Sequence, residues 1–190
     1  MLYFIKKSKK ILAILLTIPL LTIYHTQAQS VTANDNNILS LSMECPNNPQ
    51  CIYSGQDPFL LDILITNNSD QNIEIPLEAI RAYLSESYLK DIQTGEPVGP
   101  VTPPGLPLTD LLKKLTLLPA HTSHVTRAEF SKKGIKKAFK KAHSNRIAFY
   151  KSIVTSIHYQ GSKEPIGSYE NGKFERKSFV LEAEKVITKK

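Results

Sequence analysis

Apolar and polar residues alternate along much of the chain. Between Leu39 and Met43 apolar residues alternate with serines, and Phe59, Leu61, Ile63 and Ile65 repeat the pattern over a longer stretch. A period of two places the apolar side chains on one face, so both stretches predict β-strands with one buried face. The second stretch ends in Asn-Asn-Ser-Asp at 67–70, and these residues favour a turn because their short side chains bond their own backbone.

Further stretches with the same alternation, or with many β-branched and aromatic residues, predict more strands. They cover residues 73–77, 87–93, 96–101, 121–130, 146–159 and 178–187. Residues 111–118 fit either a strand or one helical turn followed by a strand. Seven to nine strands separated by turn residues are typical of an all-β sandwich or barrel. Strands do not alternate regularly with helices, so a parallel sheet is not expected.

Residues 131–143 are the exception, because their apolar residues recur with helical spacing. Ile135, Ala138, Phe139 and Ala142 form one stripe, which is the pattern of a surface helix. The opposite side is filled by Lys132, Lys133, Lys136, Lys137, Lys140 and Lys141. Ser131 can cap the first turn, although two lysines at the positive end of the helix dipole and Gly134 oppose helix formation there. We expect one short basic helix between two late strands.

The N-terminal segment has the features of a cleavable signal peptide. Lysines at positions 6, 7, 9 and 10 precede a mostly apolar run over 11–24, and Thr-Gln-Ala at 26–28 offers a cleavage site before Gln29. Pro19 interrupts the run, which is shorter than the ~20 apolar residues of a spanning helix. We therefore predict a signal peptide over 1–28 and a single mature domain over 29–190, in the periplasm or secreted and not membrane-spanning after cleavage.

Charge is divided unevenly along the mature chain. The 190 residues include 24 Lys and Arg against 17 Asp and Glu, a net charge of +7, of which the signal peptide carries four lysines. Residues 29–131 have a net charge of −7 and residues 132–190 a net charge of +10. Either the two halves neutralise each other in the folded protein, or the basic half is available to an anionic partner.

The stretch from Asp57 to Ser131 resembles the immunoglobulin-like modules of exported bacterial proteins. A strand ending in Ile-Thr-Asn-Asn-Ser-Asp, a hairpin around Gly95, a strand ending in Leu-Leu-Pro and an alternating strand follow one another. The order is similar to that of accessory and propeptide-like domains of deuterolysin-type metallopeptidases and of small bacterial proteinase-inhibitor sandwiches. The resemblance implies an immunoglobulin-like antiparallel β-sandwich.

Cys45 and Cys51 are separated by five residues. In an exported protein an even pair of cysteines favours a structural disulfide. The alternative, a redox or metal-binding pair, needs Cys-x-x-Cys spacing or basic neighbours, and neither is present locally.

No set of residues predicts catalysis, a metal or a cofactor. The chain lacks Gly-x-Ser-x-Gly, His-Glu-x-x-His and a phosphate-binding glycine loop. His121 and His124 would point to opposite faces of a strand, and so would Ser87 and Lys90, which match Ser-x-x-Lys only by letters. We expect a non-enzymatic protein, with an unrecognised catalytic site as the remaining alternative.

The strongest functional indication is the concentration of positive charge over residues 132–146. We predict that a partner binds Lys132, Lys133, Lys136, Lys137, Lys140, Lys141 and Arg146. A protein of the cell envelope, recognised as by an inhibitor or immunity protein, is the first candidate, and anionic lipids or glycans are the alternative. Nucleic acid is disfavoured outside the cytoplasm, with only Phe139 available to stack on bases. A solvated lysine face with no partner is the competing interpretation, and loops 100–107 and 161–173 offer a second contact surface.

Overall fold

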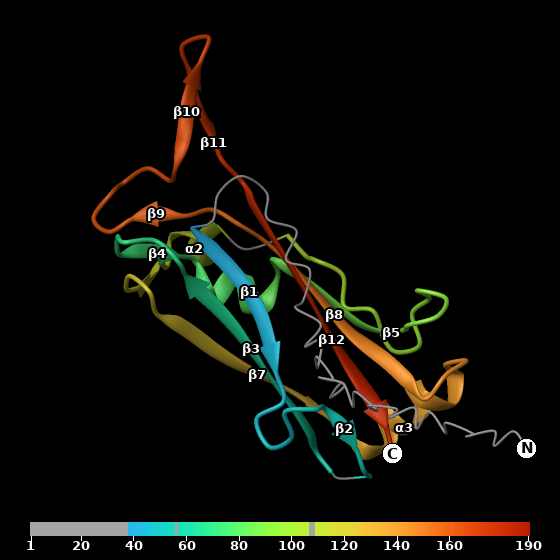
Figure 1. The fold of residues 1–190 in the computed structure, drawn as a ribbon. Coiled ribbons are helices and arrows are strands. Elements are labelled where there is room, and N and C mark those ends of the chain that lie inside the picture. Colours follow the sequence, from blue (N-terminus) through green and yellow to red (C-terminus); the bar gives the residue numbers. More distant parts are fainter. Residues whose placement is uncertain (1–37, 56, 107–108) are drawn as a thin grey trace, which may run out of the picture.

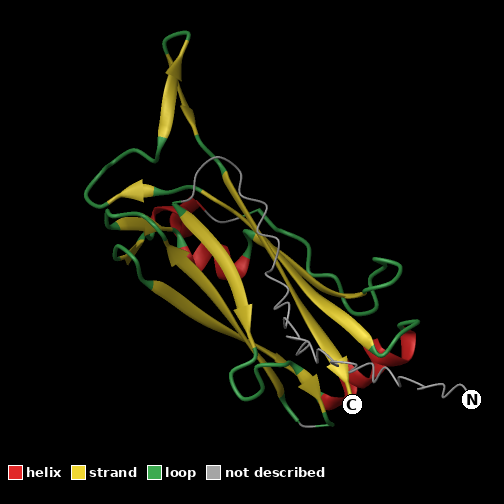
Figure 2. Ribbon diagram, in the orientation of Figure 1, coloured by secondary structure: helices red, strands yellow, loops and turns green. Residues whose placement is uncertain are grey.

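The computed structural model describes residues 38–55, 57–106 and 109–190, and the predicted signal peptide lies outside these ranges. Strands account for most of the regular structure of the described residues (Figures 1 and 2). In chain order the elements are β1 (Leu39–Glu44), β2 (Ile52–Tyr53), β3 (Phe59–Asn67), β4 (Ile73–Ile75), α1 (Leu77–Ala82), β5 (Ser85–Asp91), α2 (Thr109–Lys113), β6 (Thr116–Leu118), β7 (Ser123–Phe130), α3 (Lys132–Lys141), β8 (Arg146–Thr155), β9 (His158–Tyr159), β10 (Gly167–Glu170), β11 (Lys173–Arg176) and β12 (Phe179–Lys189).

The first large sheet has the order β1–β3–β7 and is antiparallel throughout. Leu41 lies opposite Ile65, and Ile63 lies opposite Thr126. The odd-numbered apolar residues of β1 and β3 are buried, as the alternation predicts. Among the described residues, β1 and β7 are the two edge strands of this sheet.

The second large sheet has the order β2–β12–β8–β5. The long pair β8–β12 is antiparallel and forms its centre, whereas the short β2 runs parallel to the end of β12. Ile147, Phe149 and Ile153 of β8 face the interior. Lys151 belongs to the same alternating row, so a lysine occupies an inward position of a central strand.

Two smaller sheets complete the described structure. β6, β4 and β9 form one of them, and β10 and β11 form a hairpin whose strands pair only with each other. The hairpin projects from one end of the molecule (Figure 1). Asn171 and Gly172 have positive φ angles of 52° and 76°, the backbone conformation that a tight two-residue hairpin turn requires.

The two large sheets contribute to one hydrophobic core. Leu61 and Ile65 come from the first sheet, Ile147 and Ile187 from the second, and Ile135 from α3. β1 and β12 lie side by side where the sheets meet (Figure 1). The fold is thus mostly β with antiparallel sheets, as the sequence predicts, while the immunoglobulin-like sandwich arrangement stays a prediction.

The expectation of a single helix was wrong, because α1 and α2 accompany the basic helix. The alternation through Ile73, Ile75 and Leu77 predicted a strand, but the strand ends at Ile75 and Leu77 begins α1. Pro76 lies between them, and proline cannot donate to a sheet, whereas its fixed φ suits a helix start. Thr109–Lys113 and Thr116–Leu118 realise the second of the two alternatives for residues 111–118.

The structure has no strand over 96–101, where the sequence predicted one. Only isolated bridges, Lys90 to Pro97 and Ser87 to Thr102, join this proline-rich segment to β5, since prolines supply no N–H donors. Conversely, the predicted loop 161–173 contains β10, and the described residues hold more strands than seven to nine. The additional strands are two to four residues long, which is too short for an alternation to show.

Candidate binding surfaces

The basic helix is present as α3, with its apolar residues on one side and its lysines on the other, as the sequence predicts. Ile135, Ala138 and Phe139 are buried, and the ring of Phe139 stacks on Tyr53 of β2 with centroids 5.9 Å apart. The six lysines of 132–141 are exposed, and Arg146, at the start of β8, is exposed beside them. These seven cations, Lys132, Lys133, Lys136, Lys137, Lys140, Lys141 and Arg146, are called the α3 lysine surface below.

Two oxygen acceptors stabilise the first turn of α3. The Ser131 hydroxyl oxygen accepts from the Gly134 amide at 3.1 Å, which confirms the predicted cap. The carboxylate of Asp57 accepts from the Lys132 amide at 2.9 Å. A carboxylate at this end of the helix is favourable because the dipole is positive there, and it offsets the two lysines of the first turn.

A buried carboxylate fixes the chain just after α3. Asp91, at the end of β5, accepts the backbone amide of His143 at 2.8 Å and that of Gln93 at 3.0 Å. These hydrogen bonds lower the pKa of Asp91, the bond from His143 foremost, against desolvation, which raises it. α3 is therefore held at both ends and along its apolar face.

No member of the α3 lysine surface forms an ion pair with an acidic side chain of the described residues. In the described ranges the ion pairs are Lys90–Glu184, Lys113–Asp110, Lys114–Glu78, His121–Asp70 and Arg127–Asp62. Four of these five pairs lie within the acidic half of the chain, and none includes a member of the α3 lysine surface. Contact between the halves therefore leaves the positive charge of α3 available to solvent and partners.

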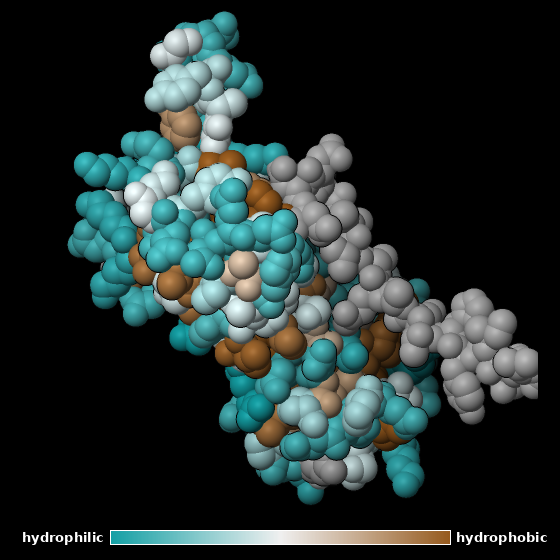
Figure 3. All heavy atoms as spheres, turned by 60° about the vertical axis from the view of Figure 1, so that its left-hand side comes forward, coloured by the Kyte–Doolittle hydropathy of each residue, from teal (hydrophilic) through white to brown (hydrophobic). Residues whose placement is uncertain are grey.

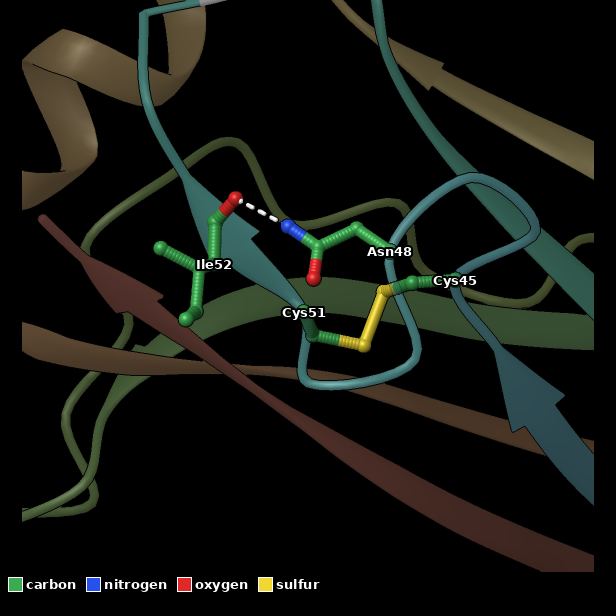
Figure 4. Close-up of a disulfide and its surroundings, with 4 residues drawn as sticks. All are labelled: Cys45, Asn48, Cys51 and Ile52. Carbon is green, nitrogen blue, oxygen red and sulfur yellow. Dashed lines mark hydrogen bonds between the residues drawn. A yellow bond between two sulfur atoms is a disulfide. The ribbon is translucent and has the colours of Figure 1, made fainter.

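The predicted disulfide is present and closes the loop between β1 and β2 (Figure 4). Both Cys45 and Cys51 are buried. The Asn48 side-chain amide donates to the Ile52 carbonyl at 2.7 Å across the same loop. Both cysteines belong to the hydrophobic core, which is the environment of a structural disulfide.

The histidines singled out by the sequence take separate partners. His121 bonds the carboxylate of Asp70 at 2.8 Å, and the Nε2 atom of His124 lies 2.9 Å from the guanidinium of Arg81. Desolvation, followed by the charge of Arg81, lowers the pKa of His124. Because a guanidinium can only donate, Nε2 of His124 is the acceptor in this contact. In the ranges that the structure describes, no three His, Cys, Asp or Glu residues are grouped as metal ligands.

A groove that the sequence analysis missed lies between β7 of the first sheet and β5 and β8 of the second. It comprises a cavity of about 490 Å³ near α1 and one of about 270 Å³ near α3, with Ser87 and Phe149 in the walls of both. We call it the inter-sheet groove. The larger cavity is lined by Ile63, Ile65, Leu77, Ile80, Arg81, Ser87, Val125, Thr126, Arg127, Ala128, Phe149, Lys151 and Ile153.

Lys151 gives the larger cavity its chemical character. It faces inward between Phe149 and Ile153, and its neighbours across the sheet are Ser87 and Ala183. No ion pair joins Lys151 to an acidic side chain of the described chain. Lys151 is half-buried, and desolvation lowers the pKa of its ammonium group. The sequence signal was available, because a charged residue interrupts an otherwise apolar alternation over 147–153.

On the face shown in Figure 3, surface hydrophobicity indicates no further site. On the face shown in Figure 3, hydrophobic residues form separate patches on a mostly hydrophilic surface. Exposed apolar residues in the described ranges include Leu117, Val125, Tyr159 and Tyr169. No helix in these ranges is both long enough and apolar enough to cross a bilayer.

Comparison with known proteins gives little further information. No protein-family model matches the chain, and no curated protein matches its sequence. A protein from Archaeoglobus fulgidus of known crystal structure aligns with 85% of this chain and 98% of its own length, at 10% sequence identity and a TM-score of 0.30.

Proposed function

We propose that this chain is an exported, non-catalytic binding module whose α3 lysine surface engages an acidic protein partner in the cell envelope or outside the cell. Inhibitors and immunity proteins work in this way, by presenting a fixed surface to one enzyme. One observation carries the proposal: six lysines project from a single anchored helix, and no carboxylate of the described residues forms an ion pair with them.

Anchoring makes the surface suitable for specific recognition. Lysines on a mobile tail attract any polyanion, whereas lysines on a helix fixed by Phe139, Ser131 and Asp57 keep their spacing. A fixed array both steers a complementary acidic partner and loses less entropy on binding.

An anionic membrane fits the same helix less well. Basic helices that lie on membranes insert their apolar face among the lipids. Ile135 and Phe139, the large apolar residues of α3, are instead buried in the protein core. Lipid binding would then rest on charge alone, and would weaken steeply with salt.

The test is capture from envelope extract by the mature chain, residues 29–190, at low salt and at about 0.15 M salt, where the screening length is about 8 Å. We expect one acidic protein to be retained at both salt concentrations. Changing Lys136, Lys137, Lys140 and Lys141 to Gln should abolish its retention, and changing them to Arg should preserve it. Removing four charges near the β10–β11 hairpin, with Lys163, Lys173, Arg176 and Lys177 changed to Gln, is the matched control.

Two outcomes would contradict the proposal. Retention of many anionic species only at low salt, together with sedimentation on acidic vesicles, would identify a general polyanion surface. An equal loss of capture in the four-lysine variant and in its hairpin control would show that net charge, rather than α3, is responsible.

A further inference from the structure

The inter-sheet groove follows the edge of β7 rather than its face. The larger cavity is lined by residues 125–128, and the smaller one continues with Glu129, Phe130 and Ser131. Successive side chains of a strand point to opposite sides. A wall formed by consecutive residues is therefore the edge of the strand, where backbone N–H and C=O groups are presented.

Among the described residues, this edge has no partner strand. β7 pairs with β3 on one side, and no other backbone hydrogen bond reaches residues 123–130 from the part of the chain that the structure describes. The edge of β5 across the groove is different, because Ser87 and Thr102 exchange two backbone hydrogen bonds and Val98 donates to Leu89. The free backbone groups of the groove thus belong to β7.

The charged residues in the walls of the larger cavity are all cations, and neither Arg81 nor Lys151 forms an ion pair with a carboxylate of the described residues. Arg81, Arg127 and Lys151 are the charged residues in the walls of the larger cavity. Arg127 is bound to the Asp62 carboxylate at 2.6 Å, and Arg81 contacts His124. Lys151 is left without a counter-ion, on the floor of the groove between two apolar side chains.

We propose that the inter-sheet groove receives an extended segment of a partner protein, which adds a strand to β7 and places an acidic side chain against Lys151. Strand addition explains the free edge, since backbone hydrogen bonds supply affinity and alternate side chains fill pockets. The acidic side chain supplies the missing counter-charge. This site lies apart from the α3 lysine surface and goes beyond the proposed function.

The register of β8 sets the sequence of the segment. Inward side chains of an added strand recur every second residue, as Phe149, Lys151 and Ile153 do on the floor. An acidic residue facing Lys151 therefore has apolar residues two positions before and after it. The recognised pattern is apolar-x-acidic-x-apolar, in an extended conformation.

The probe is a soluble synthetic peptide, Thr-Ile-Thr-Glu-Thr-Ile-Thr with capped ends and polar flanks, titrated into the mature chain. NMR should place the amide changes and new exchange protection on β7, and should show the Lys151 ammonium signal moving as its pKa rises. Replacing the central Glu by Gln should weaken binding about tenfold, because a charge-assisted hydrogen bond is lost. A version N-methylated at alternate residues keeps the side chains but cannot form the ladder, and should not bind.

Protein variants test the same contact from the other side. Lys151→Met keeps the apolar stem and removes the charge, so it should abolish the preference for Glu over Gln. Lys185→Met is the matched control, since Lys185 occupies an inward row of β12 opposite Phe149 but does not line the groove. Circular dichroism and the urea midpoint of each variant establish that it folds.

The proposal is overturned if the Glu peptide does not bind at millimolar concentration, if Glu and Gln peptides bind equally, or if protection appears on a strand other than β7. Failure here is separable from failure of the proposed function. The variant with four α3 lysines changed to Gln should still bind the peptide, and Lys151→Met should still capture the envelope partner.

Discussion

The carboxylate of Asp91 accepts the backbone amide of His143, a residue 52 positions away, at 2.8 Å. This contact joins the end of β5 to the turn that follows α3. It is one of the few contacts that fix the C-terminal end of the basic helix to the sheet, and it is made by a side chain whose residue is almost entirely buried.

Replacing Asp91 by Asn should destabilise the protein at neutral pH. It should also make the stability of the protein depend less on pH in the acidic range. The folded state lowers the pKa of Asp91 below its ordinary value of 3.8. The carboxylate therefore contributes stability that is fully present above pH 3.8 and is lost as the pH falls through the lower folded pKa. Urea midpoints from pH 7 to pH 2.5 should converge for the wild type and Asp91→Asn at the acid end. Asp110→Asn, at an exposed site of α2, should leave the midpoint at pH 7 unchanged.

Asn67 should be among the least replaceable polar residues of the described core. Its side-chain amide nitrogen lies 2.8 Å from the Gln71 carbonyl, 3.0 Å from the Leu118 carbonyl and 3.1 Å from the Pro119 carbonyl. Asn67→Leu keeps a similar side-chain volume but leaves these carbonyls without their hydrogen-bond donor, so the free energy of unfolding should fall by about 1–3 kcal/mol. Chemical denaturation measures the loss, and Asn68→Ala, next in the turn, should lose clearly less. Equal losses at 67 and 68 would contradict the role of this buried amide.

Removal of the disulfide should lower stability without unfolding the protein. Joining Cys45 to Cys51 closes a ring of seven residues, which in the chain-entropy model is worth about 2 kcal/mol. We expect the Cys45→Ala/Cys51→Ala double variant to show a lower melting temperature and an unchanged far-ultraviolet spectrum. The wild type treated with a phosphine reductant should match the variant, and a fully unfolded variant would show that the bond does more than close a loop.

Alanine substitutions should lower the free energy of unfolding much more on the buried face of α3 than on its exposed face. Phe139→Ala removes a ring stacked on Tyr53 and should lower the free energy of unfolding by about 3 kcal/mol. Lys136→Ala changes an exposed residue of the same helix and should shift it by less than about 0.5 kcal/mol. Thermal and urea unfolding of the pair compare the faces directly. A large loss for Lys136→Ala would mean that the lysine side of the helix is part of the fold rather than a free surface.

The elements predicted best from the sequence are those whose pattern is long and strict. β1, β3 and α3 carry three or more apolar residues in one period, so local sequence determines both type and buried face. α1 was missed because three alternating residues, Ile73, Ile75 and Leu77, looked like one strand, and the decisive residue was the proline between them. Short strands such as β2 and β9 exist only because a partner strand lies beside them.

The two candidate surfaces also differ in how far local sequence predicts them. The α3 lysine surface is contiguous in sequence, so composition alone located it. The inter-sheet groove is built from β3, α1, β5, β7 and β8, which no local pattern relates. Lys151 was the available clue, as the one charged residue in the apolar row 147–153, and its significance depended on knowing that its row faces another sheet.

The β10–β11 hairpin is a small cooperative unit of its own. Its strands pair only with each other, and the facing rings of Tyr169 and Phe174, 5.2 Å apart, supply its only aromatic contact in the described chain. The backbone bonds Ile166 to Ile157 and Lys177 to Ile166 tie its base to the rest of the fold. Such a unit can open while the sheets stay closed. Its amides should exchange with solvent deuterium by local fluctuations, long before those of β8 and β12, which exchange only when the whole molecule unfolds.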